Sequence, residues 1–262
     1  MPIFSLPSKY GIGTLGKEAY KFADFLAAAG QSVWQLLPLG PTSYADSPYS
    51  SFSTFAGNPY FIDLEALVED GLLKRSEIKA VDWGDDPRQI DYGKIYETRF
   101  KILALACERG WERDAEAVAA FERENAGWLP DYALFMALKR RFGMKSWLEW
   151  PDEAARMREP EALDCYRIEL AEDIRLFTYV QFLFFRQWNA LRDYVHSLGI
   201  DIVGDLPIYV ATDSADIWAE PQFFQLDEER RPQFVAGVPP DSFNADGQLW
   251  GNALYEWHAL KS

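Results

Sequence analysis

The chain has 262 residues, of which 48% are hydrophobic and 26% charged, and its formal net charge is −15. This composition is typical of a folded globular protein of one large domain or two small ones. The excess of carboxylates argues against nucleic acid and against an anionic membrane surface as partners, because binding to either relies on lysine and arginine. A neutral ligand fits this balance.

The cysteines and histidines indicate no metal or disulfide chemistry. Cys107 and Cys165 stand alone without CxxC spacing, so we expect neither a disulfide framework nor a zinc site, and a reducing cytoplasm as the location. His196 and His258 are far apart in sequence, and we interpret them as surface residues rather than as ligands or bases. Residues 1–10 lack the basic and apolar regions of a signal peptide.

The first predicted helix covers residues 17–29, with Phe22, Phe25 and Leu26 facing inward and Gly30 ending it. An apolar run at 33–37 follows, and we predict a buried strand there.

A long loop rich in serine, proline and aromatic residues follows this strand and continues to residue 63. Tyr44, Tyr49 and Phe52 are among its flat rings, and Asp46 and Ser47 are among its short hydrogen-bonding groups. A sugar ring has an apolar face and a rim of hydroxyl groups, so this mixture suits a sugar. Alternatively, the aromatic side chains simply fold back onto the core.

Helices dominate the middle of the sequence. We predict them at 92–109, 114–125 and 130–142, and from 161 to a long helix that ends near Gly199. The most apolar window, 176–185, is too short to span a bilayer. Apolar residues at helical spacing indicate instead a helix that faces the core; they are Phe177, Val180, Phe184, Trp188 and Leu191.

A second strand is predicted at 200–208. The order of helix, glycine and buried strand is typical of the βα repeat of a mostly parallel sheet, and the long stretch between the two strands predicts an inserted helical region.

Residues 11–16, Gly-Ile-Gly-Thr-Leu-Gly, match the GxGxxG pattern of dinucleotide-binding folds. That fold needs a strand directly before the first glycine and an acidic residue about 20 positions later. A turn precedes Gly11, and no Asp or Glu occurs at 31–38. The glycines are therefore predicted to shape a loop before the first helix, and a nucleotide site is the weaker alternative.

Two carboxylates, a nucleophile and an acid/base, carry out retaining glycoside chemistry. In a β/α barrel, such groups lie at the C-terminal ends of strands, and Asp205 is the candidate in that position. Asp241 and Asp46 lie on predicted loops. We interpret Asp63, which precedes a helix, as a helix cap.

Four segments together resemble the amylomaltases, the 4-α-glucanotransferases that disproportionate maltodextrins. They are SLPSKYGIGTLG (5–16), WQLLPLGPTSYADSPYSSFSTFAGNPYFIDL (34–64), GDLPIYVATDSADIWA (204–219) and VAGVPPDSFNADGQLWGNALYEW (235–257).

The resemblance implies an α/β fold, namely an incomplete (β/α)₈ barrel that holds about the first three strands and a large helical insertion. It implies strands 1 and 2 with the aromatic loop in 1–63, the helical insertion in 64–165, the long helix and strand 3 in 166–225, and an active-site loop in 226–262. The family's nucleophile and acid/base follow the fourth and fifth strands. We therefore expect a chain truncated at both ends, without a catalytic residue.

The resemblance also implies sugar-binding roles in the aromatic loop. Tyr49 matches the tyrosine that stacks on the transferred glucose. Ser47 and Asp46 lie beside it, and Ser47 is expected to bond a sugar hydroxyl. Tyr44 matches a residue of a secondary glucan-binding groove. Tyr96 is its expected partner, although a helix residue in the core is the alternative interpretation.

Further roles fall on the C-terminal part of the chain. Asp205 matches an aspartate of the active-site floor, while Asp241 and Gln248 match residues that bond sugar hydroxyls. Phe243 and Trp250 are expected to offer apolar faces, and Trp250 could instead anchor its loop.

The function implied by the resemblance is transfer of α-1,4-glucan segments between maltodextrins by a retaining double displacement, with no cofactor. The expected partners are maltodextrins, with no nucleic acid and no membrane. The alternatives are a non-catalytic maltodextrin-binding fragment, a non-functional gene piece, or a nucleotide-binding α/β protein based on Gly11–Gly16.

Overall fold

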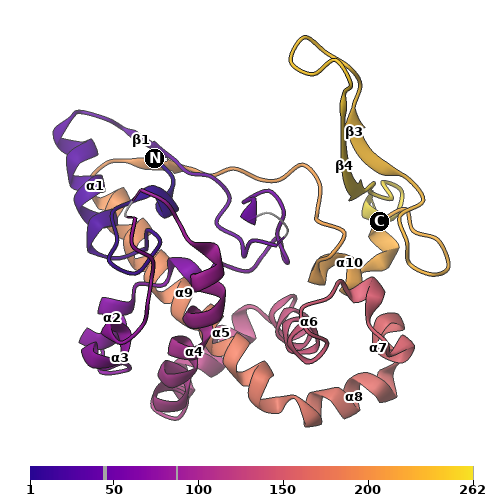
Figure 1. Ribbon diagram of the computed structural model, residues 1–262, viewed down its shortest axis with the longest axis horizontal. Coiled ribbons are helices and arrows are strands. Elements are labelled where there is room, and N and C mark those ends of the chain that lie inside the picture. The colour runs from indigo at the N-terminus through magenta and orange to yellow at the C-terminus, as the bar shows by residue number, and fades with distance from the viewer. Residues whose placement is uncertain (44–45, 87, 262) are drawn as a thin grey trace. The chain divides into compact units, whose positions relative to one another are not determined.

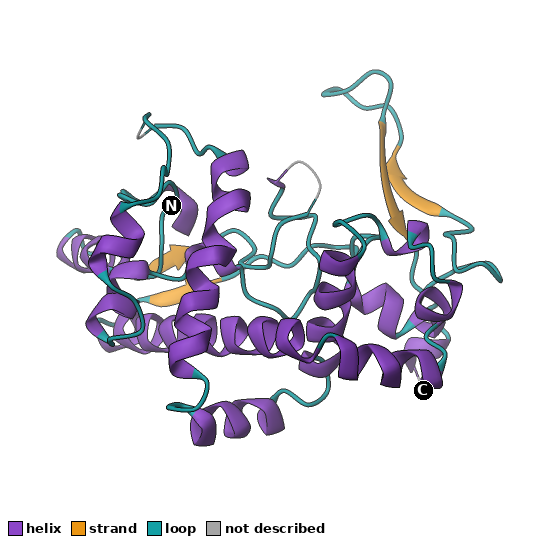
Figure 2. Cartoon of the chain, turned by 60° about the horizontal axis from the view of Figure 1, so that its bottom comes forward, coloured by secondary structure: helices purple, strands orange, loops and turns teal. Residues whose placement is uncertain are grey.

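The computed structural model describes residues 1–43, 46–86 and 88–261 (Figure 1). The chain forms two compact units, each assembled from three segments. The first unit contains Met1–Pro41, Gly57–Gly127 and Arg175–Asp205. The second unit contains Thr42–Ala56, Trp128–Ile174 and Leu206–Ser262. The fold is mixed α/β with helices dominating, as Figure 2 shows.

The first unit combines a short parallel sheet with helices. Its helices are α1 (Lys17–Ala28), α2 (Leu64–Glu69), α3 (Arg75–Lys79), α4 (Tyr92–Gly110), α5 (Ala115–Glu124) and most of α9 (Ala171–Ser197). Strands β1 (Val33–Gln35) and β2 (Asp201–Val203) pair in parallel, with Trp34 opposite Ile202. The Trp34 side chain is buried in the core, and its indole Nε1 donates to the Met1 carbonyl oxygen at 2.8 Å.

Helix α9 forms the wall of this core. Phe177, Val180, Phe184 and Leu191 are all buried on it, which confirms the predicted core-facing helix. The Gln181 side chain also holds Gly57, because its Oε1 accepts from the Gly57 N–H at 2.7 Å and its Nε2 donates to the Gly57 carbonyl at 2.9 Å. The chain that leaves the aromatic loop is therefore held to α9 by a pair of hydrogen bonds.

The second unit is built around helices and a hairpin. Its helices are α6 (Leu129–Arg141), α7 (Glu153–Met157), α8 (Pro160–Glu169), α10 (Ala215–Ala219) and the first turn of α9. A core of large rings joins them, in which Phe135 and Trp150 each pack against Trp218. Strands β3 (Val235–Val238) and β4 (Gln248–Ala253) form an antiparallel hairpin. This hairpin extends away from the helices of its own unit (Figure 1 and Figure 2).

Short 3₁₀ turns connect these elements; they are Ile3–Ser5, Pro59–Phe61, Trp147–Glu149, Pro221–Phe223 and Ala259–Lys261.

Three sequence predictions need correction. The first strand is not a buried strand over 33–37, since β1 ends at Gln35 and Val33 is 48% exposed. Phe25 is 62% exposed, not inward, because α1 buries Ala19 and Ala23, and Phe25 lies about 200° around the helix from Ala23. The second strand is shorter than the predicted 200–208, since β2 ends at Val203. Pro207 has no N–H to continue a ladder, and Leu206 and Ile208 are exposed. The parallel pairing is confirmed, while the incomplete (β/α)₈ barrel with about three strands stays a prediction.

Candidate functional site

The aromatic loop presents Tyr49 at the tip of a tight turn. The Ser50 N–H donates to the Ser47 carbonyl at 3.1 Å, and the Tyr49 N–H donates to Ser47 Oγ at 3.3 Å. Ser43 and Ser50 close the loop below the tip. The Ser43 N–H donates to the Ser50 carbonyl oxygen at 2.8 Å, and the two hydroxyl oxygens also lie 2.8 Å apart. The Tyr49 side chain is 45% exposed, so the turn displays the ring instead of burying it.

Asp46 lies at the start of this turn in a left-handed conformation, with φ of 55°. Burial raises the pKa of its carboxyl group. Its Oδ1 is buried and has no hydrogen-bond partner among the residues that the structure describes. A carboxylate oxygen of this kind is suited to accept from a ligand hydroxyl. Tyr44, the other aromatic candidate here, lies outside the described residues.

The C-terminal side of the loop is bonded to α10. The Phe52 carbonyl accepts from the Ala215 N–H at 2.8 Å, and the Thr54 N–H and hydroxyl both donate to Asp216. Burial raises the pKa of Asp216, although its bonds to Thr54 oppose that shift. This part of the loop is therefore fixed by polar contacts within the second unit.

Asp241 shapes the connection between β3 and β4. Its Oδ1 accepts from the backbone N–H groups of Phe243 and Asn244, both at 2.8 Å. The Phe243 ring at this turn is 95% exposed. Asp241 is thus a turn former through one carboxylate oxygen, as short polar residues commonly are.

Gln248 and Trp250 lie together on β4. The Trp250 Nε1 donates to Gln248 Oε1 at 3.0 Å, which fixes the amide so that its NH₂ group points away from that contact. The Trp250 ring is 45% exposed and lies 6.4 Å from the Tyr209 ring, centroid to centroid. Trp250 therefore both contacts its own unit and offers a face to solvent.

The remaining two candidates belong to the first unit. Asp205 follows β2 by two residues, at the C-terminal end of the parallel pair. Tyr96 is 44% exposed on α4, against Tyr60 at 5.8 Å, so it is not a core residue. Its role as a partner of Tyr44 stays a prediction.

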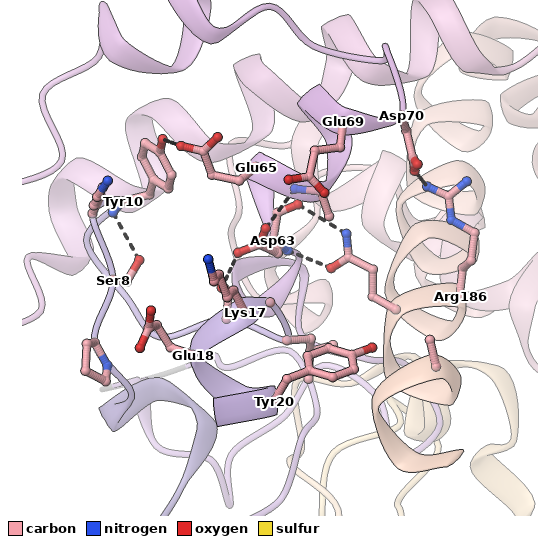
Figure 3. A pocket seen from close by; sticks show the side chains of 18 of the residues that line it. Ser8, Tyr10, Lys17, Glu18, Tyr20, Asp63, Glu65, Glu69, Asp70 and Arg186 are labelled. Carbon is pink, nitrogen blue, oxygen red and sulfur yellow. Dashed lines mark hydrogen bonds and ion pairs between the residues drawn. The ribbon is translucent and has the colours of Figure 1, made fainter. Parts of the chain in front are cut away.

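A pocket of about 850 Å³ opens in the first unit between the 7–20 segment, α2 and α9 (Figure 3). Its polar groups largely bond to one another: Tyr10 donates to Glu65, Arg186 pairs with Asp70, and Asp63 accepts from the Ala66 N–H at 2.8 Å. Asp63 is the N-cap of α2, as predicted. Among the described residues, none of the candidate sugar-binding side chains lines this pocket.

The glycines at 11–16 shape a loop, as predicted. No strand precedes them, since Ile3–Ser5 is a 3₁₀ turn, and Gly11 has φ of 79°. A Cβ on Gly13 would lie 2.0 Å from the Ile3 carbonyl oxygen, so this position needs glycine for close chain approach. The dinucleotide-binding geometry is not formed.

The described residues offer neither a membrane-spanning helix nor a cluster of metal ligands. None of the helices there has the length and apolar character to cross a membrane. No group of three or more His, Cys, Asp or Glu side chains is placed to hold a metal ion in the same part of the chain. Neither Cys107 nor Cys165 forms a disulfide with another described residue.

Sequence reasoning missed the residues that support the aromatic loop. Lys139 is fully buried on α6 and pairs with Asp213 at 2.6 Å. Its Nζ also lies 4.8 Å from the centre of the Phe52 ring. The available signal was weak: Lys139 directly follows the apolar run Ala133–Leu138, but it is also the first of three successive basic residues.

Comparison with known proteins shows a consistent similarity. A family model described as 4-alpha-glucanotransferase matches residues 1–262. The 4-alpha-glucanotransferase of Clostridium butyricum is 48% identical over 262 residues, which is all of this chain and 54% of that protein. The Thermus thermophilus 4-alpha-glucanotransferase is 50% identical, over 98% of this chain and 51% of that protein.

Solved structures of amylomaltases show the same similarity. An amylomaltase from Streptococcus agalactiae in complex with acarbose superposes with a TM-score of 0.97 at 43% identity, over all of this chain and 53% of that one. An amylomaltase from Corynebacterium glutamicum shares the fold, with a TM-score of 0.70 at 22% identity, over 97% of this chain and 35% of that one. The chain spans about half the length of the curated relatives it matches.

Proposed function

Because the chain belongs to the 4-alpha-glucanotransferase family over its whole length, we propose that it carries the donor-binding loops of an enzyme that transfers α-1,4-glucan segments between maltodextrins. The observation that carries this proposal is the Tyr49 ring, which a serine-closed turn holds exposed in the aromatic loop. A flat exposed ring beside short polar groups matches the apolar face and hydroxyl rim of glucose.

We assign the hydroxyl-binding roles by the atoms that each side chain leaves available. The Gln248 amide already accepts from Trp250 through Oε1, so its NH₂ group is the part that donates to a sugar oxygen. Asp241 uses Oδ1 for its own turn, so Oδ2 is the acceptor for a hydroxyl. Beside Tyr49, the Asp46 carboxylate accepts from a sugar hydroxyl, and the Ser47 hydroxyl donates to or accepts from one.

The apolar contacts come from Tyr49, Phe243 and Trp250. Each is worth about 0.5–1.5 kcal/mol beyond area burial if stacking on a sugar resembles stacking between rings. Tyr44 and Tyr96 are each proposed to contact glucan away from the active site, and Asp205 is proposed as the aspartate of the active-site floor.

The reaction of the family-length protein is a retaining double displacement. A carboxylate attacks the anomeric carbon as the leaving 4-oxygen takes a proton from the acid/base. A second sugar's 4-OH then gives its proton to the deprotonated acid/base and displaces the carboxylate. We propose that both reacting carboxylates lie outside these 262 residues. The chain by itself then binds maltodextrin without reacting. Cys107 and Cys165 are not disulfide-bonded, which fits the proposed cytoplasmic location.

Calorimetric titration of the 262-residue protein with maltoheptaose, acarbose and NAD tests the binding function. We expect maltoheptaose to bind, and Tyr49→Ala to weaken it by about 2- to 13-fold, the equivalent of losing one stacking contact. Phe25→Ala is the matched control, since it removes another exposed ring from a different surface. Tight NAD binding that Gly13→Val abolishes would contradict the proposal.

An activity assay separates the enzyme from the non-catalytic binding protein. We expect the purified chain to release no glucose and no longer dextrins from maltotriose, because the covalent route needs a nucleophile. Disproportionation that survives Asp205→Asn would show that a reacting carboxylate is present among these residues.

A further inference from the structure

The segment Thr212–Asp216 connects to three separate parts of the second unit. The Thr212 hydroxyl donates to the Gly251 carbonyl of β4 at 2.9 Å, and its carbonyl accepts from Trp147 Nε1 at 2.9 Å. The Ala215 N–H and the Asp216 carboxylate hold the aromatic loop at Phe52 and Thr54. Both proposed glucan-binding loops are therefore bonded to this one segment.

Asp213 fixes the segment to the core of the unit. Its Oδ1 accepts from the Trp147 N–H at 3.1 Å, and its Oδ2 accepts from Lys139 Nζ at 2.6 Å. Lys139 also donates to the Lys145 carbonyl at 2.9 Å. The ammonium group thus bonds to a carboxylate and a backbone oxygen at once.

The Lys139 charge also contacts the aromatic loop. Its side chain has no exposed surface, and burial lowers its pKa while Asp213 opposes that shift. The ammonium lies 4.8 Å from the Phe52 ring centre and 5.6 Å from that of Phe135. A cation this close to a ring face is attracted to it, most strongly away from water. The same charge therefore binds the 212–216 segment and the ring of Phe52.

We propose that Lys139 and Asp213 are positioning residues that set the conformation of the aromatic loop and hold Tyr49 in its sugar-binding orientation. Lys139 is fully buried in this ion pair, whereas the Asp213 side chain is 29% exposed. A largely buried ion pair adds little net stability compared with an apolar pair of the same volume. The role that we propose is orientation. The ammonium on α6 donates to the 212–216 segment and contacts the Phe52 ring, and an apolar side chain could form neither interaction. The link to sugar binding rests on the proposed function.

Amide hydrogen exchange tests the positioning role without any sugar. The Ala215 amide donates to the Phe52 carbonyl, and the Thr54 amide donates to the Asp216 carboxylate. In Lys139→Met, we expect both amides to exchange at least about tenfold faster. Asp131→Asn is the matched control, because it breaks another ion pair of α6, with Arg158 at 2.7 Å, that does not touch the loop. Unchanged protection of both amides in Lys139→Met would overturn the proposal.

A double variant separates positioning from stability. Single replacements, Lys139→Met or Asp213→Asn, leave an unpaired charge and should lower the urea midpoint. Lys139→Met with Asp213→Asn removes both charges, so the midpoint should recover while amide protection and maltoheptaose affinity stay about tenfold lower. If the urea midpoint, the amide protection and the maltoheptaose affinity all recover together, Lys139 and Asp213 have a purely structural role, and the proposal is wrong. If no variant or wild-type protein binds maltoheptaose, the proposed function fails, and the exchange result still decides the positioning role.

Discussion

Gly57 is a point where one added methyl group should destabilise the first unit. A Cβ at this position would lie 1.9, 2.0 and 2.4 Å from the Cδ1, Cε1 and Cγ atoms of the Phe184 ring. The ring is buried at 2% exposure and packs edge-on against Phe185. The backbone of Gly57 is also held on both sides by Gln181.

Gly57→Ala therefore has two ways to relieve the clash, and each carries a cost. Moving the Phe184 ring overpacks the core, which typically costs about 1–3 kcal/mol. Moving the backbone instead breaks two hydrogen bonds to Gln181, at about 0.5–1.5 kcal/mol each. Because the cheaper route decides, we expect a loss of about 1–3 kcal/mol in the free energy of unfolding.

Urea unfolding followed by circular dichroism measures this loss, with Gly127→Ala as the control. Gly127 belongs to the same unit, and a Cβ there meets nothing within 4 Å, so alanine should be neutral or stabilise by up to about 1 kcal/mol. Adding Phe184→Leu to Gly57→Ala should cost less than the sum of the two changes, since the smaller side chain relieves the clash. Equal midpoints for Gly57→Ala and Gly127→Ala would refute the reasoning.

Two further predictions concern charged groups of the first unit. Hydrogen bonds from Arg109 and from the Lys74 backbone lower the pKa of Glu77 from 4.5 to about 2. The stability that this shift contributes is complete above about pH 4.5 and is lost as the pH falls towards 2, so Glu77→Gln should flatten the pH dependence of unfolding in that window. A carboxyl titration by NMR that gives a midpoint near 4.5 would contradict this. Asp63→Ala removes the N-cap bond to Ala66 and should cost about 0.5–2 kcal/mol in thermal or urea unfolding, whereas Asp63→Asn, which keeps a capping oxygen, should cost less.

The helices could be predicted from sequence because their apolar spacing is local information. The predicted 92–109 and 130–142 helices are α4 and α6 within two residues at each end. The strands were harder, because three-residue strands such as β1 and β2 depend on pairing between distant segments. The apolar residues after β2 looked like strand, but Leu206 is 86% exposed and outside any ladder.

The sequence could predict candidate-site residues that lie within a local motif, but not contacts between residues that are distant in sequence. The exposure of Tyr49 and Phe243 agrees with their proposed roles, and both lie in motifs that the sequence displays openly. The supporting contacts were not predictable, because Lys139 and Asp213 are separated by 74 positions. No periodicity or motif indicates that these two charges meet.

The two interpretations of the aromatic loop, sugar surface or folded-back core, divide among its residues. Tyr60 is 8% exposed and belongs to the core of the first unit, whereas Tyr49 and Phe55 are 45% and 59% exposed. The serines explain how rings stay outside: Ser47 and Ser43 bond to backbone or side-chain atoms within the loop itself. These bonds hold the turn in a conformation that leaves the Tyr49 ring exposed, which is what the proposed stacking on a sugar requires.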